Sequence, residues 1–277
     1  MKLFTPSINI GHLNLEIDIE GNLETYLPSI FSLLDKEKIN WIKISKQYQK
    51  ELEYRKNKLF HLGEKEIVVE ACLFDVITQV LKGHSKYLDL LRFFNEIFLN
   101  LKKKTSVEEK KLLKTTIYNL LINVDKNYLN FIGEMAILNN LKNDGYILVA
   151  IEYPLNAESD NSKSVDFIIQ KGEKYTAIEV MNIHLPIIEE FNDVERSVTQ
   201  KIRNKLNTKQ KGAKYQFILA PVLWGEYNVL KLINQYYEKN EFPFNDVLFP
   251  MAYQSYLKKD RKESRFIFGS IKKLILQ

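Results

Sequence analysis

Three acidic side chains fall inside segments that are otherwise largely apolar. Asp166 lies in the predicted strand Ser164–Ile169, Glu179 lies in the predicted strand Thr176–Met181, and Glu134 lies inside a predicted helix. A carboxylate in an apolar strand is costly to bury unless a cation or a proton donor compensates it. Two such strands in succession therefore indicate a binding site for a divalent cation.

The two strands are predicted to bring their acids together. Lys171–Lys174 has Gly172 inside it and is typical of a β-hairpin turn, so the strands should pair as antiparallel neighbours. Alternation then puts Asp166 and Glu179 on the same face. Two adjacent carboxylates repel, and one pKa should rise unless a cation neutralises them. Mg²⁺ suits such a pair because it binds few carboxylates and keeps waters. Helical spacing turns Glu134 toward the interior as well.

These acids belong to an ordered series of predicted elements. A helix, three strands, a helix and a strand follow one another, and a further helix and two strands come after them. The predicted elements are helix Tyr128–Leu141, strands Tyr146–Tyr153, Ser164–Ile169 and Thr176–Met181, helix Ile187–Thr208, strand Tyr215–Ala220, helix Gly225–Lys239, and strands Asp246–Tyr253 and Arg265–Gly269.

With acids at Glu134, Asp166 and Glu179, this order resembles the PD-(D/E)xK, or restriction-endonuclease-like, nuclease superfamily over roughly residues 126–240. The resemblance implies an αβββαβ core and a metal-dependent nuclease that hydrolyses DNA phosphodiester bonds, for example in a defence or mobile-element system. It also implies that Asp166 and Glu179 bind Mg²⁺ or Mn²⁺. The Val180 carbonyl would be a third ligand, and Glu134 would support the site.

The sequence departs from this pattern at Met181, which stands where the superfamily has a lysine. That lysine orients the attacking water and stabilises charge in the transition state, and a methionine can do neither. Three interpretations follow. A lysine has moved to another element, with Lys201 favoured as a catalytic residue and Lys163 as a second candidate. Alternatively, Asn182 or His184 supplies a polar group near the water. Finally, the site is catalytically inactive and the protein acts as a binding module for nucleic acid or protein.

The predicted helix after the second acidic strand is strongly basic. Seven basic residues and no acidic ones lie between Arg196 and Lys214. Such a segment can follow the phosphates of a nucleic acid, DNA in the first instance, although a merely solvated helix face gives the same composition. The predicted nucleic-acid-binding residues are Lys201, Arg203, Lys205 and Lys209.

Composition favours a globular protein with a sizeable core, and the predicted elements give it a mixed α+β or α/β class. The chain has 277 residues, 45% hydrophobic content and a formal net charge of +5, and its one cysteine, Cys72, cannot form an internal disulfide. Its first residues lack the apolar run of a signal peptide, and no segment is long enough for a membrane helix. We therefore expect a soluble cytoplasmic protein without membrane contacts.

Two domains are predicted, a mainly helical region over residues 1–125 and the nuclease-like core with a C-terminal extension over 126–277. The helical region would bind the substrate, a second copy of the chain or a protein partner. Alternating residues 3–20 predict a short β-hairpin that ends near Gly21–Asn22. The other predicted features are helices Ile67–Leu81 and Tyr87–Leu101, a break at Lys82–His84, a loop at Lys102–Ser106, and a capping box formed by Ser106 and Glu109.

A different chemistry is suggested by one pair in the helical region. Arg55 and His61 are separated by five residues, and this spacing resembles the Arg-x(4–6)-His pair of metal-independent HEPN ribonucleases. Chance produces such a pair easily in a basic chain, so the acidic constellation remains the favoured interpretation.

Overall fold

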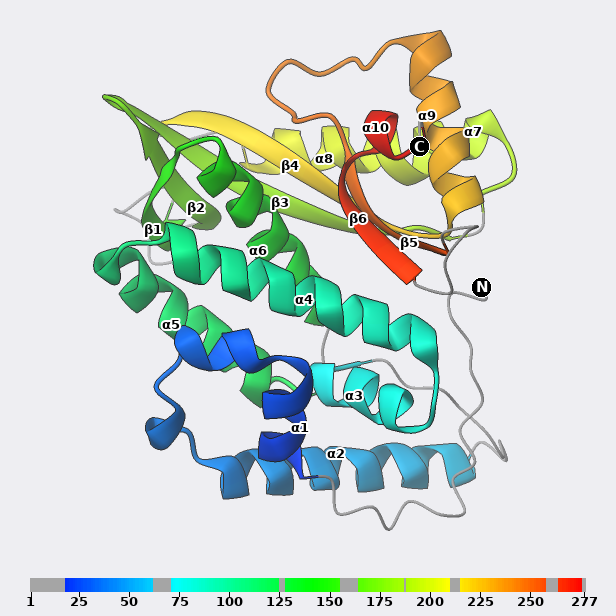
Figure 1. Ribbon diagram of the computed structural model, residues 1–277. Coiled ribbons are helices and arrows are strands. Elements are labelled where there is room, and N and C mark those ends of the chain that lie inside the picture. Colours follow the sequence, from blue (N-terminus) through cyan, green and yellow to red (C-terminus); the bar gives the residue numbers. More distant parts are fainter. Residues whose placement is uncertain are drawn as a thin grey trace. The chain divides into compact units, whose positions relative to one another are not determined.

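The computed structural model describes residues 18–61, 71–124, 128–154, 164–186, 188–209, 215–257 and 264–275. The chain separates into two compact units. The helical unit comprises Lys2–Lys103 and Leu113–Ile132, and the sheet unit comprises Lys104–Leu112 and Gly133–Gln277. The described residues form helices and one six-stranded mixed sheet, so the prediction of a mixed α+β fold is confirmed (Figure 1). None of the helices in these ranges is both long and apolar enough to cross a membrane.

The described residues of the helical unit form α-helices and short 3₁₀ turns. Two helices, α5 and α6, have residues in both units. The elements are α1 (Ile19–Tyr26), η2 (Pro28–Ser32), η3 (Lys36–Lys38), α2 (Trp41–His61), α3 (Leu73–Leu81), α4 (Ser85–Lys104), α5 (Val107–Ile122) and the start of α6 (Tyr128–Asn143).

The predicted N-terminal hairpin is wrong where the structure describes it. Residues 3–17 lie outside the described ranges, but Ile19–Tyr26 is a helix and not the end of a strand. The Asp18 side chain accepts a hydrogen bond from the Gly21 N–H at 2.9 Å and so caps the first turn. The helix also buries Ile19 and Leu23, which are four residues apart. A local cap and helical burial therefore override the alternating pattern.

The break predicted at Lys82–His84 is confirmed, and the long loop predicted after the next helix is wrong. Gly83 separates α3 from α4 with a φ of +88°, a conformation that glycine adopts without strain. Helix α4 continues to Lys104, because lysines favour helix, and the loop is only Thr105–Ser106. The part of the predicted helix before Leu73 lies mostly outside the described residues.

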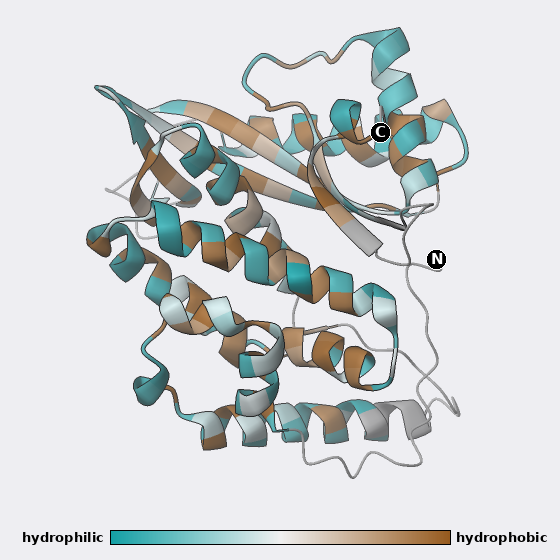
Figure 2. Ribbon diagram, viewed as in Figure 1, coloured by the Kyte–Doolittle hydropathy of each residue, from teal (hydrophilic) through white to brown (hydrophobic). Residues whose placement is uncertain are grey.

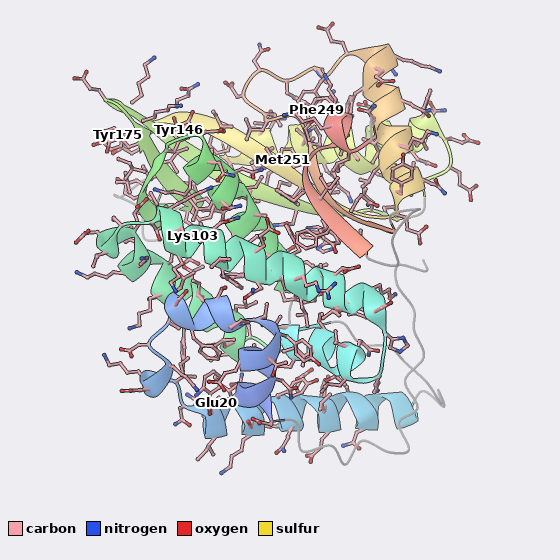
Figure 3. The ribbon with its side chains drawn as sticks, viewed as in Figure 1. Glu20, Lys103, Tyr146, Tyr175, Phe249 and Met251 are labelled. Carbon is pink, nitrogen blue, oxygen red and sulfur yellow. The ribbon has the colours of Figure 1, made fainter. Side chains whose placement is uncertain are left out.

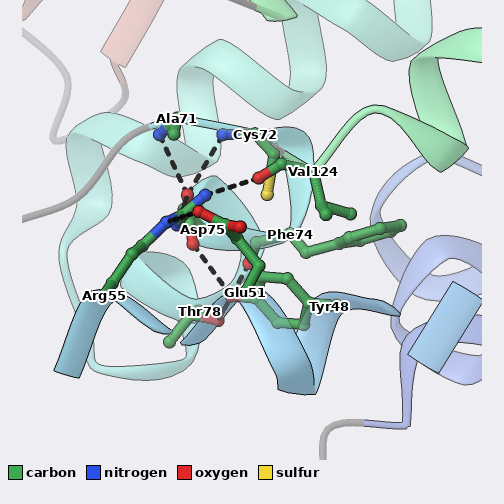
Figure 4. A network of polar contacts seen from close by, with 9 residues as sticks. All are labelled: Tyr48, Glu51, Arg55, Ala71, Cys72, Phe74, Asp75, Thr78 and Val124. Carbon is green, nitrogen blue, oxygen red and sulfur yellow. Dashed lines mark hydrogen bonds and ion pairs between the residues drawn. The ribbon is translucent and has the colours of Figure 1, made fainter. Parts of the chain in front are cut away.

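A buried polar network holds the helical unit together (Figure 4). Arg55 donates hydrogen bonds to Glu51 at 2.8 Å, to Asp75 at 2.9 Å and to the Val124 carbonyl. The Tyr48 hydroxyl donates to the other oxygen of Asp75 at 2.9 Å. Because these residues belong to α2, α3 and the segment after α5, the network fixes three parts of the unit to one another.

This network also bears on the Arg55–His61 pair. The guanidinium of Arg55 is engaged by two carboxylates and a carbonyl, which is the geometry of a structural ion pair. The side chain of His61 lies outside the described part of the chain. The ribonuclease interpretation stays untested, and the observed role of Arg55 is to join helices.

The sheet unit contains α6 and the elements that follow it. Its elements after α6 are β1 (Ile147–Pro154), β2 (Ser164–Lys171), β3 (Lys174–His184), α7 (Phe191–Val194), the π-helical segment η4 (Glu195–Thr199), α8 (Gln200–Lys209), β4 (Gln216–Trp224), α9 (Tyr227–Asn240), β5 (Met251–Leu257), β6 (Ser264–Ser270) and α10 (Ile271–Ile275).

Neighbouring strands of the sheet follow the order of the chain, from β1 to β6. The pairs β1–β2, β2–β3 and β5–β6 are antiparallel, whereas β3–β4 and β4–β5 are parallel. The stretch from α6 to β4 thus reads helix, three strands, helix, strand. Two predicted boundaries are wrong: the helix expected from Ile187 begins at Phe191, and the strand expected from Asp246 begins at Met251.

Helices lie on both faces of the sheet (Figure 1). The residues of β3 and β4 are mainly hydrophobic, whereas hydrophilic and hydrophobic residues alternate along α8 (Figure 2). Val198 of η4 and Ile202 of α8 are fully buried in one core with Ala177 and Leu219 of the sheet, and this core also includes Ile233 of α9. On the other face, Gly133 of α6 lies against Asn182 of β3. The core thus fixes α8 over one face of the sheet at the acidic strands.

The capping box predicted at Ser106 and Glu109 is confirmed, and Glu109 makes further contacts. Its carboxylate accepts hydrogen bonds from the backbone N–H groups of Ser106 and Leu148, both at 2.7 Å, and from Lys142 at 2.5 Å. Burial alone would raise the pKa of Glu109, but these three donors hold it below its usual value. The start of α5, the end of α6 and β1 therefore meet at one carboxylate.

Removing the cation from this cluster should destabilise the sheet unit. We expect Lys142→Met to lower the free energy of unfolding by about 3 kcal/mol, because the Glu109 charge would stay buried without its partner. Urea unfolding followed by circular dichroism measures the change. The matched control is Lys111→Met at an exposed position of α5, which should change stability by less than about 0.5 kcal/mol. Equal losses of stability in both variants would contradict the stabilising role of the Lys142–Glu109 ion pair.

Candidate functional site

The hairpin of β2 and β3 positions the two central acids. Its turn has Gly172 at a φ of +58°, and Lys171 pairs with Lys174 on either side of it. The antiparallel register ends with Phe167 opposite Ile178, so Asp166 and Glu179 are each the next residue beyond the last pair. The Val180 N–H donates a hydrogen bond to Asp166 Oδ2 at 2.6 Å. The predicted antiparallel pairing of these strands is therefore confirmed.

Glu179 is a buried carboxylate with two lysine partners. Only 3% of the residue is exposed. Lys205 Nζ lies 2.6 Å from Glu179 Oε1, and Lys209 Nζ lies 3.1 Å from the same oxygen. Lys209 also donates to the Ser164 carbonyl at the start of β2. Both lysines belong to α8, so the helix packed on this face supplies the positive charge that compensates the Glu179 carboxylate.

The carboxyl groups influence one another's protonation. Burial, and then the charge of Glu179, raise the pKa of Asp166 to about 7, against the effect of the Val180 N–H and both lysines. Burial raises the pKa of Glu134 well above its usual value, and the charges of Asp166, Glu152 and Glu179 add to this. Glu134 of α6 is therefore within electrostatic range of the two strand acids. Perturbed carboxyl groups held together in this way are typical of functional sites.

Glu152 is a member of this group that sequence reasoning missed. It lies in β1 with a φ of +50°, which is a strained conformation for a residue with a side chain. The pairing of β1 with β2 also shifts register between Leu148 and Ala150. Asp166 and Glu179 were identified because each is an acid in a largely apolar strand. Glu152 has the same pattern in β1, so the same criterion would have identified it as the fourth acid.

The predicted catalytic Lys201 lies elsewhere on α8. Its side chain is exposed, and its charge, after burial, helps to lower the pKa of His184 at the end of β3. Arg203 forms an ion pair with Glu195 at 3.3 Å. Met181 is partly buried against the hydrophobic core. The structure therefore brings Lys205 and Lys209, rather than Lys201, to the carboxylates, and Lys163 lies outside the described residues.

The donor chemistry fits a hard divalent cation. Asp166 and Glu179 supply carboxylate oxygens, the ligands that Mg²⁺ and Mn²⁺ prefer, and burial, followed by the charge of Glu179, raises the pKa of Asp166. The Lys205 ammonium group lies beside Glu179 Oε1, where a bound metal cation would also lie. Within the described ranges, no three His, Cys, Asp or Glu side chains form a ready-made cage. A cation here would therefore keep much of its water and compete with Lys205.

The approach of α6 to the sheet depends on a glycine next to Glu134. A Cβ atom on Gly133 would lie 2.0 Å from the Asn182 side-chain oxygen. That oxygen accepts a hydrogen bond from the indole N–H of Trp224 at 2.9 Å, so Asn182 is held in place. Asn182, proposed above as a polar group near the water, thus has a structural role beneath α6. Gly133 permits the close approach that brings Glu134 to the acids.

Comparison with protein-family models, with curated proteins and with solved structures found no match to this chain. The functional assignment therefore depends on the chemistry of the residues in the sheet unit.

The raised pKa of Asp166 predicts how stability depends on pH. The folded protein holds this proton up to a pKa of about 7, whereas the usual value is 3.8. The contribution to stability is therefore fully present below about pH 4 and is lost as the pH rises through 7. In EDTA, we expect Asp166→Asn to remove up to about 1.4 kcal/mol per pH unit of this slope.

The measurement is urea unfolding at several pH values between 4 and 8. Glu189→Gln, at an exposed position before α7, is the control and should keep the slope of the parent protein. An unchanged slope in Asp166→Asn would contradict the shift.

A double-mutant cycle tests the close approach at Gly133. In the parent protein, Gly133→Ala should destabilise by about 1–2 kcal/mol, because the methyl group displaces Asn182 and leaves the Trp224 N–H without its acceptor. In an Asn182→Ala background, the same change should stabilise by up to about 1 kcal/mol, because alanine favours helix. Thermal or urea unfolding gives both values. The same sign in both backgrounds would show that Asn182 does not limit the approach of α6.

Proposed function

We propose that the protein is a metal-dependent nuclease that hydrolyses DNA phosphodiester bonds. The observation that carries the proposal is the pair of carboxylates on the neighbouring antiparallel strands β2 and β3, the partly buried Asp166 and the buried Glu179, beneath a basic helix. The order αβββαβ around this pair and the resemblance to the PD-(D/E)xK superfamily support it. A purely structural ion pair would not need Glu134 and Glu152 nearby, which add negative charge to the site.

Asp166 and Glu179 would hold Mg²⁺ or Mn²⁺, with the Val180 carbonyl as a further ligand. Such an ion, when bound, polarises the phosphate and lowers the pKa of a bound water. The Val180 N–H fixes one oxygen of Asp166, which orients this carboxylate before any ligand arrives. Glu134, whose pKa is raised, would accept or hold a proton at the edge of the site.

Lys205 is the best candidate for the role that Met181 cannot fill. Its ammonium group lies at Glu179, and its side chain is 33% exposed, compared with 16% for Lys209. Lys209 is further anchored by the Ser164 carbonyl. Lys205 can therefore turn from Glu179 to a phosphate oxygen while Lys209 stays in place. There it would stabilise the charge that develops in the transition state.

The exposed face of α8 would position the nucleic acid. Lys201 and Arg203 are exposed on this helix, one turn or less from Lys205. Contacts of this kind act on phosphates and give little sequence preference, and they weaken as salt increases. Lys201 therefore changes from the predicted catalytic lysine to a residue of the binding surface.

One observation favours a second function, a binding module without catalysis. Lys205 and Lys209 already neutralise Glu179, so the fold needs no cation to bury this carboxylate. In that case the protein would bind nucleic acid and show no selective affinity for Mg²⁺ or Mn²⁺. Isothermal titration calorimetry with both ions separates the two functions, because the nuclease requires binding that Asp166→Asn abolishes.

Cleavage assays test the proposed nuclease directly. We expect the parent protein to cleave plasmid, linear duplex or single-stranded DNA with Mg²⁺ or Mn²⁺, and Asp166→Asn to be inactive. Lys205→Met should lower kcat by about 10²-fold or more, the usual effect of removing one group that stabilises transition-state charge. The controls are Lys201→Met, which should mainly raise KM, and Lys231→Met on the exposed side of α9, which should change neither. Activity that survives in Asp166→Asn, or its absence from the parent protein, would refute the nuclease.

A further inference from the structure

Three tyrosines form a row at one end of the sheet. Tyr175 is the second residue of β3, directly after the hairpin turn, and Tyr215 directly precedes β4. The parallel register of Thr176 with Gln216 places residues 175 and 215 side by side. The ring centroids of Tyr175 and Tyr215 are 5.6 Å apart, and those of Tyr215 and Tyr153 are 6.1 Å apart.

The row runs from the edge of the core to the surface. Tyr153 and Tyr215 are partly buried against the hydrophobic core of the sheet unit. Tyr175 ends the row at the hairpin end of β3, and 40% of it is exposed (Figure 3). Its ring is tilted by only 32° from that of Tyr215. The outermost member therefore offers aromatic surface to the solvent while the inner members hold it in place.

This row adjoins the charged site. Tyr153 pairs with Val165, the residue before Asp166. The Lys209 ammonium group contacts the carbonyl of Ser164, one residue earlier. The exposed Lys174 precedes Tyr175. Aromatic rings, lysines and the acidic pair thus follow one another over a short stretch of the sheet.

We infer that Tyr175, supported by Tyr215 and Tyr153, is a stacking platform for the unpaired bases of a single-stranded nucleic acid. The inference rests on the proposed nuclease and names its substrate class. Bases stack on aromatic side chains while lysines follow the phosphates, and every base has a face that can stack. In a duplex those faces are covered by neighbouring base pairs. The platform therefore favours a single strand, or an unpaired end, over intact duplex.

Binding without cleavage tests the platform separately from the nuclease. Fluorescence anisotropy in EDTA would use labelled 12-nucleotide oligothymidylate, 12-nucleotide oligouridylate and a 12-base-pair duplex. Loss of one stacked base weakens binding by about 1–3 kcal/mol, or roughly 5- to 150-fold. We therefore expect Tyr175→Leu to weaken oligothymidylate binding at least about fivefold, and Tyr175→Phe to keep it within about twofold. Duplex binding should not change in either variant.

The matched control is Tyr227→Leu. Tyr227 is also in the sheet unit and is 45% exposed, but it lies beyond the other end of β4 from Tyr215. It should bind like the parent protein. Tyr215→Leu is a second test and should weaken single-strand binding as well, with thermal unfolding to confirm the fold. Similar losses for oligouridylate would extend the platform to RNA, and losses for oligothymidylate alone would restrict it to DNA.

The outcomes separate the two proposals. If Tyr175→Leu binds the oligonucleotides as tightly as the parent protein, or if the parent binds none of them, the platform is refuted whatever the cleavage assays give. Equal loss of duplex binding would also refute it, because stacking on unpaired bases cannot explain that result. If single-strand binding depends on Tyr175 and no DNA is cleaved, the platform stands and the nuclease fails.

Discussion

The buried charge of Glu179 is the constraint to which the other features of the site respond. A carboxylate that is only 3% exposed within a sheet costs several kcal/mol unless a cation lies against it. Lys205 and Lys209 meet this need, and they can do so only because η4 and α8 pack along the same face through Val198 and Ile202. The hairpin register, the placement of α8 and the electrostatics of the site therefore depend on one another.

The site nevertheless contains more acidic groups than the pairing of Glu179 with Lys205 and Lys209 requires. Asp166, Glu134 and Glu152 add further acidic groups, and burial, reinforced by these neighbouring charges, raises the pKa values of Asp166 and Glu134. A protein selected for stability alone would carry apolar residues at the two positions where burial raises the pKa, because replacing buried ionic groups is often stabilising. Strain at Glu152 points the same way, since strained residues cluster at functional sites. The excess charge and the strain together suggest function rather than packing.

The sequence predicted what local chemistry determines. A glycine-centred turn and alternating strands suffice to predict the antiparallel hairpin that carries Asp166 and Glu179, and the capping box at Ser106 needs only four residues. The lysines that pair with Glu179 were harder to predict from the sequence. Residues 201, 205 and 209 lie four apart on one row of α8, so periodicity identifies the row. Which turn lies over Glu179 depends on where the helix begins, and four residues shift a side chain by about 6 Å along the axis. Lys201 was favoured because it flanks the apolar positions Val198 and Ile202, and that pattern alone does not show which turn lies over Glu179.

The arrangement of the sheet face also links the tyrosine row to the acids. Tyr175, Ala177 and Glu179 alternate onto one face of β3, so the ring and the carboxylate are about 13 Å apart along the strand. Ala177 lies between them and is buried in the core with Val198 and Ile202, so a nucleic acid held at Tyr175 cannot follow the strand itself. It would instead follow the exposed part of α8, where the partly exposed Lys205 reaches the buried Glu179. The exposed ring and this lysine thus mark the two ends of the path to the carboxylates.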